Sequence, residues 1–374
     1  MPTEEHRLLR ESLREFAAKR LAPFSADWDR TATFPKQALA ELAALGTFGV
    51  AVPEHYGGSG MDTTALAITL EEIAAGDGAT STIISVNNCP VCAILLAWGN
   101  EPQKQKYLVP LAQGKMLGAF CLTEPHVGSD ASALRTTAVR DGDHWVLNGV
   151  KQFITSGKTA DVAIVMAVTD KAAGNRGISA FVVETKMPGY VVARIEEKMG
   201  QHASDTAQIL FENCRVPSEN LIGDEGAGYK IALSGLEGGR IGIASQALGM
   251  ARAAYEAALK YAREREAFGK PIFQHQAVQF RLANMATQLE AARQLIYHAA
   301  GLKDDGQPCL KQAAMAKLFA SEMAETVCSD AIQIHGGYGY VADFPVERIY
   351  RDVRVCQIYE GTSDIQRIVI ARHL

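Results

Sequence analysis

A single carboxylate stands beside a glycine close to the C-terminus, in the stretch Ile358–Ser363, just ahead of a predicted final helix. Ser363 and Gln366 have the spacing of a capping box, and apolar residues recur at helical period after them. Glu360 is therefore expected just before a helix N-terminus, on a turn where Gly361 permits unusual backbone angles and a close ligand approach. That position suits a catalytic base; the alternative is a structural or solvated glutamate.

Two further stretches carry groups suited to a flat polar ligand. Cys121–Asp130 combines small residues, hydroxyls and a glycine, so its N–H groups and hydroxyls can hydrogen-bond a planar ring; the alternative is an ordinary turn with a serine cap. Asn148–Gly157 predicts a strand whose aromatic residue and threonine can lie against a flat cofactor; the alternative is a hairpin with a core aromatic.

Two more stretches suit phosphate or ribose. The arginines of Arg263–Lys270 can clamp a pyrophosphate, although a charged, solvated helix end has the same composition. In Gln333–Tyr340, adjacent glycines let a backbone approach phosphate closely, although they also suit a helix C-cap. No G-x-G-x-x-G follows a strand and no P-loop is present, so a dinucleotide is not expected to be held in the Rossmann manner.

Composition narrows the class of protein. The net charge of −5 argues against a general nucleic-acid binder. The seven cysteines have no regular spacing, and the lone C-x-x-C at Cys89–Cys92 has no second pair, so we expect buried, reduced thiols and no metal site. No window is expected to span a membrane, and the N-terminus is charged, with Glu4, Glu5 and Glu11 arguing against a transit peptide. These features favour a cytoplasmic protein.

The period of the apolar residues changes twice along the chain, from helical to alternating and back, which predicts an α+β fold. The expected domains are an N-terminal helical domain, a middle β domain and a C-terminal helical bundle, at residues 1–119, 120–223 and 224–374. Within the bundle, three long helices are expected at about 229–265, 275–302 and 308–335.

Taken together, these stretches resemble the acyl-CoA dehydrogenase family over essentially the whole chain. The matching motifs, in order, are Thr123-Glu124-Pro125 with Gly128-Ser129-Asp130, Lys198-Met199-Gly200, Phe211 to Pro217, Gly238-Gly239-Arg240-Ile241, Phe268-Gly269-Lys270, Gln333 with Gly336-Gly337, and Tyr359-Glu360-Gly361-Thr362. The resemblance implies an N-terminal helical domain, a middle β domain and a C-terminal four-helix bundle, with FAD bound non-covalently between them. The short-chain (butyryl) and short branched-chain branches are the most similar.

The resemblance also implies which residues bind ligands. Thr123 and Ser129 would bond the flavin ring, with Phe153, where the family commonly has Trp, on its other side. The full set implied for FAD is Phe120, Leu122, Thr123, Gly128, Ser129, Phe153, Ile154, Thr155, Arg265, Phe268, Gln276, Gln333, Gly336, Gly337, Thr362 and Ser363. The set implied for acyl-CoA is Ser129, Glu237, Arg240 and Gly361.

The activity implied is α,β-dehydrogenation of a short-chain fatty acyl-CoA to the trans-2-enoyl-CoA, as in fatty acid β-oxidation. Glu360 would take the α-proton, flavin N5 would accept the β-hydride, and an electron-transfer flavoprotein would receive the electrons from a homotetramer. Alternatives are a methyl-branched (isobutyryl or 2-methylbutyryl) or medium-chain substrate, an acyl-CoA oxidase, or a non-catalytic nucleic-acid-binding relative.

A second position for the base is known in the family, immediately before the arginine that matches Arg240. Here that position is Gly239, which has no side chain to act as a base. Glu237 lies three residues from Arg240, so on a helix the two are expected to pair with each other or with the ligand. Glu360 is therefore the expected base.

Overall fold

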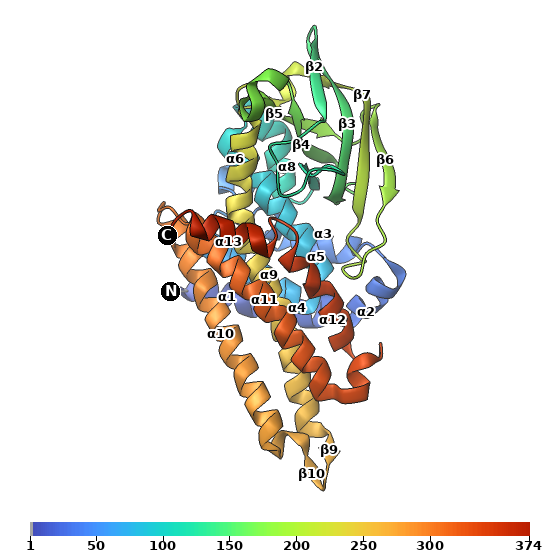
Figure 1. The fold of residues 1–374 in the computed structure, drawn as a ribbon, viewed down its shortest axis with the longest axis vertical. Helices are drawn as coiled ribbons and strands as arrows, with labels where there is room; N and C mark the ends of the chain where they lie inside the picture. Colours follow the sequence, from blue (N-terminus) through green and yellow to red (C-terminus); the bar gives the residue numbers. More distant parts are fainter. Residues whose placement is uncertain (1–2) are drawn as a thin grey trace.

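A computed structural model describes residues 3–374, in which helices precede and follow a central sheet (Figure 1). Three short helices of the first part, α1, α2 and α5, pack against α4. The first turn of α4 is capped by Asp62, whose Oδ1 accepts a 2.7 Å bond from the Ala65 N–H. The helices are α1 (Glu4–Phe16), α2 (Ala22–Thr31), α3 (Lys36–Ala44), α4 (Thr63–Gly76), α5 (Gly78–Val86), α6 (Ala93–Trp98), α7 (Glu101–Gln103) and α8 (Val109–Ala112).

The segment Gly78–Trp98 corrects one expectation. It is helical over most of its length and is long and apolar enough to cross a membrane, whereas no such window was expected. Of its most apolar window, 83% is buried inside the protein, against α9 and the sheet. Burial on nearly all sides explains the composition, which is that of a core helix. The segment is interrupted at Cys89, whose backbone is extended, and at Pro90.

The middle of the chain forms one mixed sheet in the order β6-β7-β3-β2-β4-β5-β8, with β1 parallel to β4. Alternating apolar residues of its strands, with Trp145 and Phe181 edge to face at 5.5 Å, fill the core of the sheet. The strands are β1 (Gly118–Cys121), β2 (Thr137–Asp141), β3 (His144–Thr155), β4 (Val162–Val168), β5 (Ile178–Glu184), β6 (Tyr190–Ile195), β7 (Thr206–Pro217) and β8 (Leu221–Ile222).

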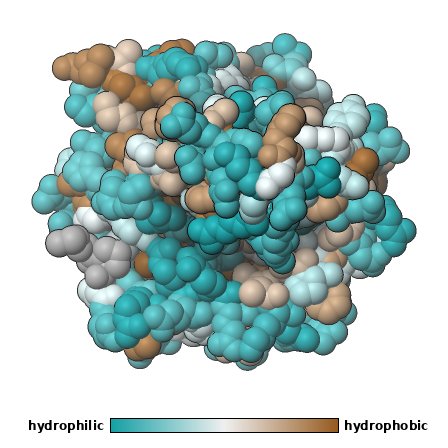
Figure 2. Space-filling view, turned by 90° about the horizontal axis from the view of Figure 1, so that it is seen from below, coloured by the Kyte–Doolittle hydropathy of each residue, from teal (hydrophilic) through white to brown (hydrophobic). Residues whose placement is uncertain are grey.

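The last part consists of three long helices that run side by side, with α4 of the first part packed against two of them (Figure 1). They lie within two residues of the expected ranges, and two shorter helices pack on α11. A small hairpin joins α9 and α10 at the tip of the bundle, where hydrophilic residues separate the apolar patches (Figure 2). The elements are α9 (Gly228–Glu264), β9 (Glu266–Ala267), β10 (Lys270–Pro271), α10 (Gln276–Asp304), α11 (Leu310–His335), α12 (Pro345–Val353) and α13 (Ser363–Ala371).

The division between the first two domains needs adjustment. Because β1 begins at Gly118, a boundary at 119/120 would cut through that strand. The division at 223/224 falls in the loop between β8 and α9, and we keep it as a proposal.

Small residues let α9 approach α4 closely, so a larger residue at this contact should destabilise the fold. A Cβ on Gly249 of α9 would lie 2.1 Å from the Glu71 carbonyl oxygen of α4, so Gly249→Ala must push the helices apart and should cost about 1–3 kcal/mol. A Cβ on Gly301, inside α10, would meet nothing within 4 Å, so Gly301→Ala should stabilise by about 0.5–1 kcal/mol. Thermal unfolding of both variants measures this; equal shifts in the same direction would contradict the packing account.

Candidate active site

Glu360 lies on the turn that leads into α13, and the cap of that helix differs from the predicted one. The N-cap is Thr362, whose Oγ1 accepts a 3.4 Å bond from the Ile365 N–H, and not Ser363. Because the helix begins one residue earlier than the capping-box spacing requires, Gln366 reaches back to the turn instead. Its Nε2 donates to the carbonyl oxygens of Glu360, at 3.2 Å, and Gly361, at 2.9 Å.

The backbone of this turn is left-handed at two successive residues. Glu360 has φ 53° and Gly361 has φ 93°. A non-glycine residue adopts such a φ at a cost, so surrounding contacts must hold it. Lys317 of α11 donates from Nζ to the Gly361 carbonyl at 2.8 Å, and the preceding Tyr359 donates from its hydroxyl to Gln246 Oε1 of α9 at 2.5 Å. The turn is therefore fixed by three helices.

The carboxylate of Glu360 rests directly on the backbone of α9. A Cβ on Gly239 would lie 1.9 Å from Glu360 Oε2, so a side chain at position 239 and this carboxylate exclude each other. Oε2 is buried and has no hydrogen-bond partner among the described residues. Burial raises the pKa of Glu360 to about 7, against the opposing effect of the charges on Lys317 and Arg240. A carboxylate with this pKa is suited to proton abstraction near neutral pH.

Two polar residues of α9 face the same region. Arg240 is buried, its Nε has no partner among the described residues, and burial lowers its pKa. Glu237 contacts Cys309 Sγ at 3.4 Å and Lys303 Nζ at 4.0 Å. Among the described residues, Glu237 and Arg240 form no ion pair with each other, and their contact with a ligand stays a prediction.

The residues expected beside the flavin ring lie together where β1 ends. The Gln152 N–H donates to the Thr123 carbonyl at 2.8 Å, which joins this stretch to β3. Phe153 has φ 59° at a bulge in β3 and is 64% exposed, so its ring is free to contact a ligand. Ile154 differs, because its side chain lies in the core of the sheet and leaves only its backbone for a ligand. Phe120, Leu122 and Thr155 are partly or fully buried nearby, and Gly128 and Ser129 lie on an exposed turn.

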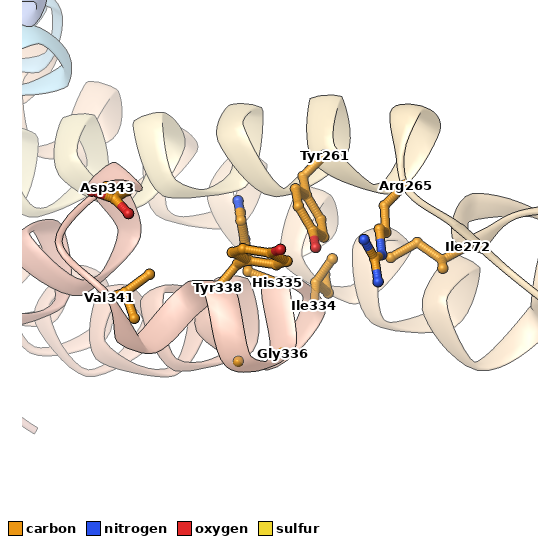
Figure 3. Close-up of a pocket in the computed structure, with 10 residues that line it drawn as sticks. Tyr261, Arg265, Ile272, Ile334, His335, Gly336, Tyr338, Val341 and Asp343 are labelled. Atoms are coloured by element: carbon orange, nitrogen blue, oxygen red, sulfur yellow. The ribbon is translucent and has the colours of Figure 1, made fainter.

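A second group lines a groove of about 550 Å³ at the tip of the bundle. Figure 3 shows Tyr261 of α9 and Arg265, the residue that follows α9, pointing toward Tyr338, which follows α11. Arg265 lies 5.8 Å from the centre of the Tyr338 ring, and the His335 ring stacks on Tyr261 at 4.4 Å. Gly336 and Gly337 also line the groove, and a Cβ on either would point into open space.

Three other expected residues do not line this groove. Phe268, which is 95% exposed on the β9–β10 turn, Gln276 and Gln333 lie on the surface nearby. Conversely, Tyr261 was not predicted as a site residue, and the stretch Gln333–Tyr340 was predicted for its adjacent glycines and not for the rings of His335 and Tyr338. A tyrosine at helical period resembles a core residue, so the sequence alone gives no signal for Tyr261.

These two groups provide what FAD requires. The exposed Phe153 ring and the polar groups around Thr123 suit a flat ring system. Arg265, beside the open backbone of Gly336 and Gly337, suits a pyrophosphate and its attached nucleoside. The residues present therefore fit the cofactor.

Comparisons with known proteins agree over the full chain. Three family descriptions match: "Acyl-CoA dehydrogenase, N-terminal domain" over residues 3–115, "middle domain" over 119–214 and "C-terminal domain" over 226–374. The short-chain specific acyl-CoA dehydrogenase of Rattus norvegicus mitochondria is 49% identical, covering 99% of this chain and 90% of the relative.

Two solved structures are similarly close. Butyryl-CoA dehydrogenase from Megasphaera elsdenii has a TM-score of 0.97 at 43% identity, covering 100% of this chain and 98% of that chain. A chain in a structure described as the electron transferring flavoprotein of Acidaminococcus fermentans has a TM-score of 0.98 at 49% identity, with the same coverage. The α+β fold with a middle β domain between two helical domains is thereby confirmed. The chain belongs to the acyl-CoA dehydrogenase family, FAD-dependent oxidoreductases that act on the CH–CH group of acyl-CoA.

Proposed function

We propose that this protein dehydrogenates a short-chain acyl-CoA between its α and β carbons, with Glu360 as the base for the α-proton. The observation that carries the proposal is the buried Oε2 of Glu360, which has no partner among the described residues and lies on a left-handed turn. An unpartnered buried carboxylate is costly, so its retention is best explained by a reacting group that contacts it.

The residues of the chain account for the proton step. Glu360 Oε2 would remove the α-proton, and the enolate oxygen that develops needs a hydrogen-bond donor. The backbone N–H of Glu360 donates to no atom of the described residues, so it is free to serve the thioester oxygen. Arg240, Glu237, Ser129 and Gly361 would hold the rest of the acyl-CoA. When bound, FAD supplies the acceptor for the β-hydrogen, which leaves as hydride.

The choice of a short acyl chain rests on the names of the relatives. Short-chain specific and butyryl-CoA dehydrogenases are nearly half identical to this chain over its length. The alternative substrates are methyl-branched or medium-chain acyl-CoAs. The alternative electron acceptor is oxygen, as in an acyl-CoA oxidase. We further propose an electron-transfer flavoprotein as electron acceptor, since a close structural relative comes from a structure described by that name. Seven free, buried cysteines suit a reducing compartment such as the cytoplasm.

The position of the two ligand groups supports an oligomer. The residues expected beside the flavin ring lie at the sheet. Arg265 and its groove lie at the tip of the helical bundle, at the opposite end of the molecule (Figure 1). One cofactor would contact both kinds of group if they came from two different subunits. We therefore propose a homotetramer in which each cofactor is shared.

Replacing the base tests the proposal directly. Glu360→Gln should keep the fold, the yellow colour and acyl-CoA binding, because the amide is nearly isosteric. Its turnover should fall by roughly a hundred-fold to ten-thousand-fold, as expected when a positioned base is lost. Stopped-flow bleaching of the flavin by butyryl-CoA measures the step.

Glu237→Gln is the matched control, because it removes the other carboxylate of this region. It should weaken acyl-CoA binding more than it slows flavin reduction at saturating substrate. Near-normal bleaching in Glu360→Gln would mean that another residue is the base.

The raised pKa of Glu360 also predicts how stability depends on pH. The folded protein holds this proton up to about pH 7, whereas an unfolded glutamate loses it near 4.5, so the stability that the proton contributes is lost as pH rises between these values. Gln mimics the protonated acid at every pH. The melting temperature of Glu360→Gln minus that of the native protein should therefore be larger at pH 8 than at pH 5. A difference that does not change with pH would contradict the raised pKa.

A panel of acyl-CoAs of rising length and branching tests the substrate class. We expect kcat/KM to be highest near butyryl-CoA among straight chains. A higher value for octanoyl or longer thioesters, or for isobutyryl-CoA, would overturn the short straight-chain assignment while leaving the role of Glu360 unaffected.

A further inference from the structure

Lys317 is a buried cation next to the base. It lies in the first half of α11, and its side chain is 0% exposed. Among the described residues, the one hydrogen bond of this side chain is the 2.8 Å bond to the Gly361 carbonyl. No carboxylate of the described residues lies within 4.0 Å of its Nζ. The carbonyl that it binds belongs to the residue that directly follows Glu360.

The other fully buried lysine shows the usual arrangement. Lys151 of β3 is also 0% exposed, but its Nζ forms a 2.9 Å ion pair with Glu124 and donates to the Leu122 carbonyl at 3.0 Å. A buried ammonium without a close counter-charge loses its hydration with little compensation. The position of Lys317 therefore needs an explanation other than stability.

Two donors hold the turn that carries the base, and they differ in charge. Gln366 Nε2 already donates to the Gly361 carbonyl at 2.9 Å and to the Glu360 carbonyl at 3.2 Å. The hydrogen bond from Lys317 thus repeats one that a neutral side chain makes. What Lys317 adds is a positive charge near the Glu360 carboxylate.

We propose that Lys317 is a positioning residue for the base: its ammonium holds the Gly361 carbonyl and sets a positive charge beside the Glu360 carboxylate. This inference rests on the proposed role of Glu360. Lys317 would keep the base ionised when the acyl chain and the cofactor exclude water from the Glu360 carboxylate, which lies against Gly239 of α9.

Four ionisable groups lie around Lys317 and Glu360. They are Arg240 of α9, Cys89 of the turn before α6, Cys356 of the turn after α12, and Glu322 of α11, which pairs with Arg367 at 2.6 Å. Burial raises the pKa of Cys89 to about 12 and that of Cys356 to about 11, so both thiols are neutral near pH 7. Burial lowers the pKa of Lys317 to about 8, so it still carries its charge where Glu360 begins to ionise.

Two matched variants separate charge from anchoring. Lys317→Met and Gln366→Met each remove one donor to the Gly361 carbonyl, but only the first removes a charge. FAD content and melting temperature first establish that each holoenzyme is folded. The pH dependence of flavin bleaching by butyryl-CoA then reports the ionisation of the base in each variant.

We expect the rising limb of this profile to move to higher pH in Lys317→Met, by about one unit, which lowers the rate on that limb about ten-fold. Gln366→Met should slow the reaction without moving the limb. An unmoved limb in Lys317→Met, or equal shifts in both variants, would overturn the proposal.

If Lys317→Met does not accumulate as folded protein, Lys317→Gln, which keeps a neutral donor, provides the same comparison and the same outcomes. The two proposals can fail separately. Normal flavin bleaching in Glu360→Gln would overturn the assignment of Glu360 as the base. Loss of bleaching in Glu360→Gln, together with an unmoved rising limb of the pH profile in Lys317→Met, would overturn only the role of Lys317.

Discussion

The carboxylate of Glu360 occupies the space where a side chain at position 239 would otherwise lie, and the site depends on this contact. Only glycine leaves room, because a Cβ would come within 1.9 Å of Oε2. Seated there, Oε2 is shielded from water and has no partner among the described residues, so burial raises the pKa of Glu360 to about 7. The left-handed backbone of the turn directs the Glu360 side chain to this position. Lys317 and Gln366 hold the turn through hydrogen bonds to the Gly361 carbonyl.

A chain of buried polar contacts ties this turn to the other two domains. Tyr359 donates to Gln246 of α9, which in turn contacts Thr82 of α5. The Thr82 hydroxyl donates to Gln201 Oε1, in the loop after β6, at 2.6 Å, and the Gln201 backbone N–H donates to Asp352 of α12. Because a buried polar group that loses its partner is costly, each domain restrains the others around the base. The active site is thus a product of the whole packing arrangement.

Local signals in the sequence predicted the parts that depend on neighbours along the chain. The helical period located the long helix Gly228–Glu264 to within one residue, and the carboxylate–glycine pair pointed to Glu360. Tertiary contacts decided the rest. The low charge of the segment Gly78–Trp98 is that of a helix covered by other elements, and the structure supplies those elements. Thr362, and not Ser363, caps α13, and Gln366 therefore bonds the turn, whose place is set by contacts with α9 and α11. A lysine in an alanine-rich helix is expected on the surface. The burial of Lys317 beside the Glu360 turn therefore could not be predicted before α11 and the turn were placed together.

Proton abstraction by Glu360 can be measured apart from hydride transfer. A 3-thia acyl-CoA has acidic α-protons and no hydrogen on the atom at position 3, so in deuterated water it reports α-proton removal alone. We predict that the native protein exchanges these protons with solvent and that Glu360→Gln exchanges them at least about a hundred-fold more slowly. Equal exchange rates in the two proteins would contradict the claim that the buried Glu360 carboxylate, which lies against Gly239, is the base.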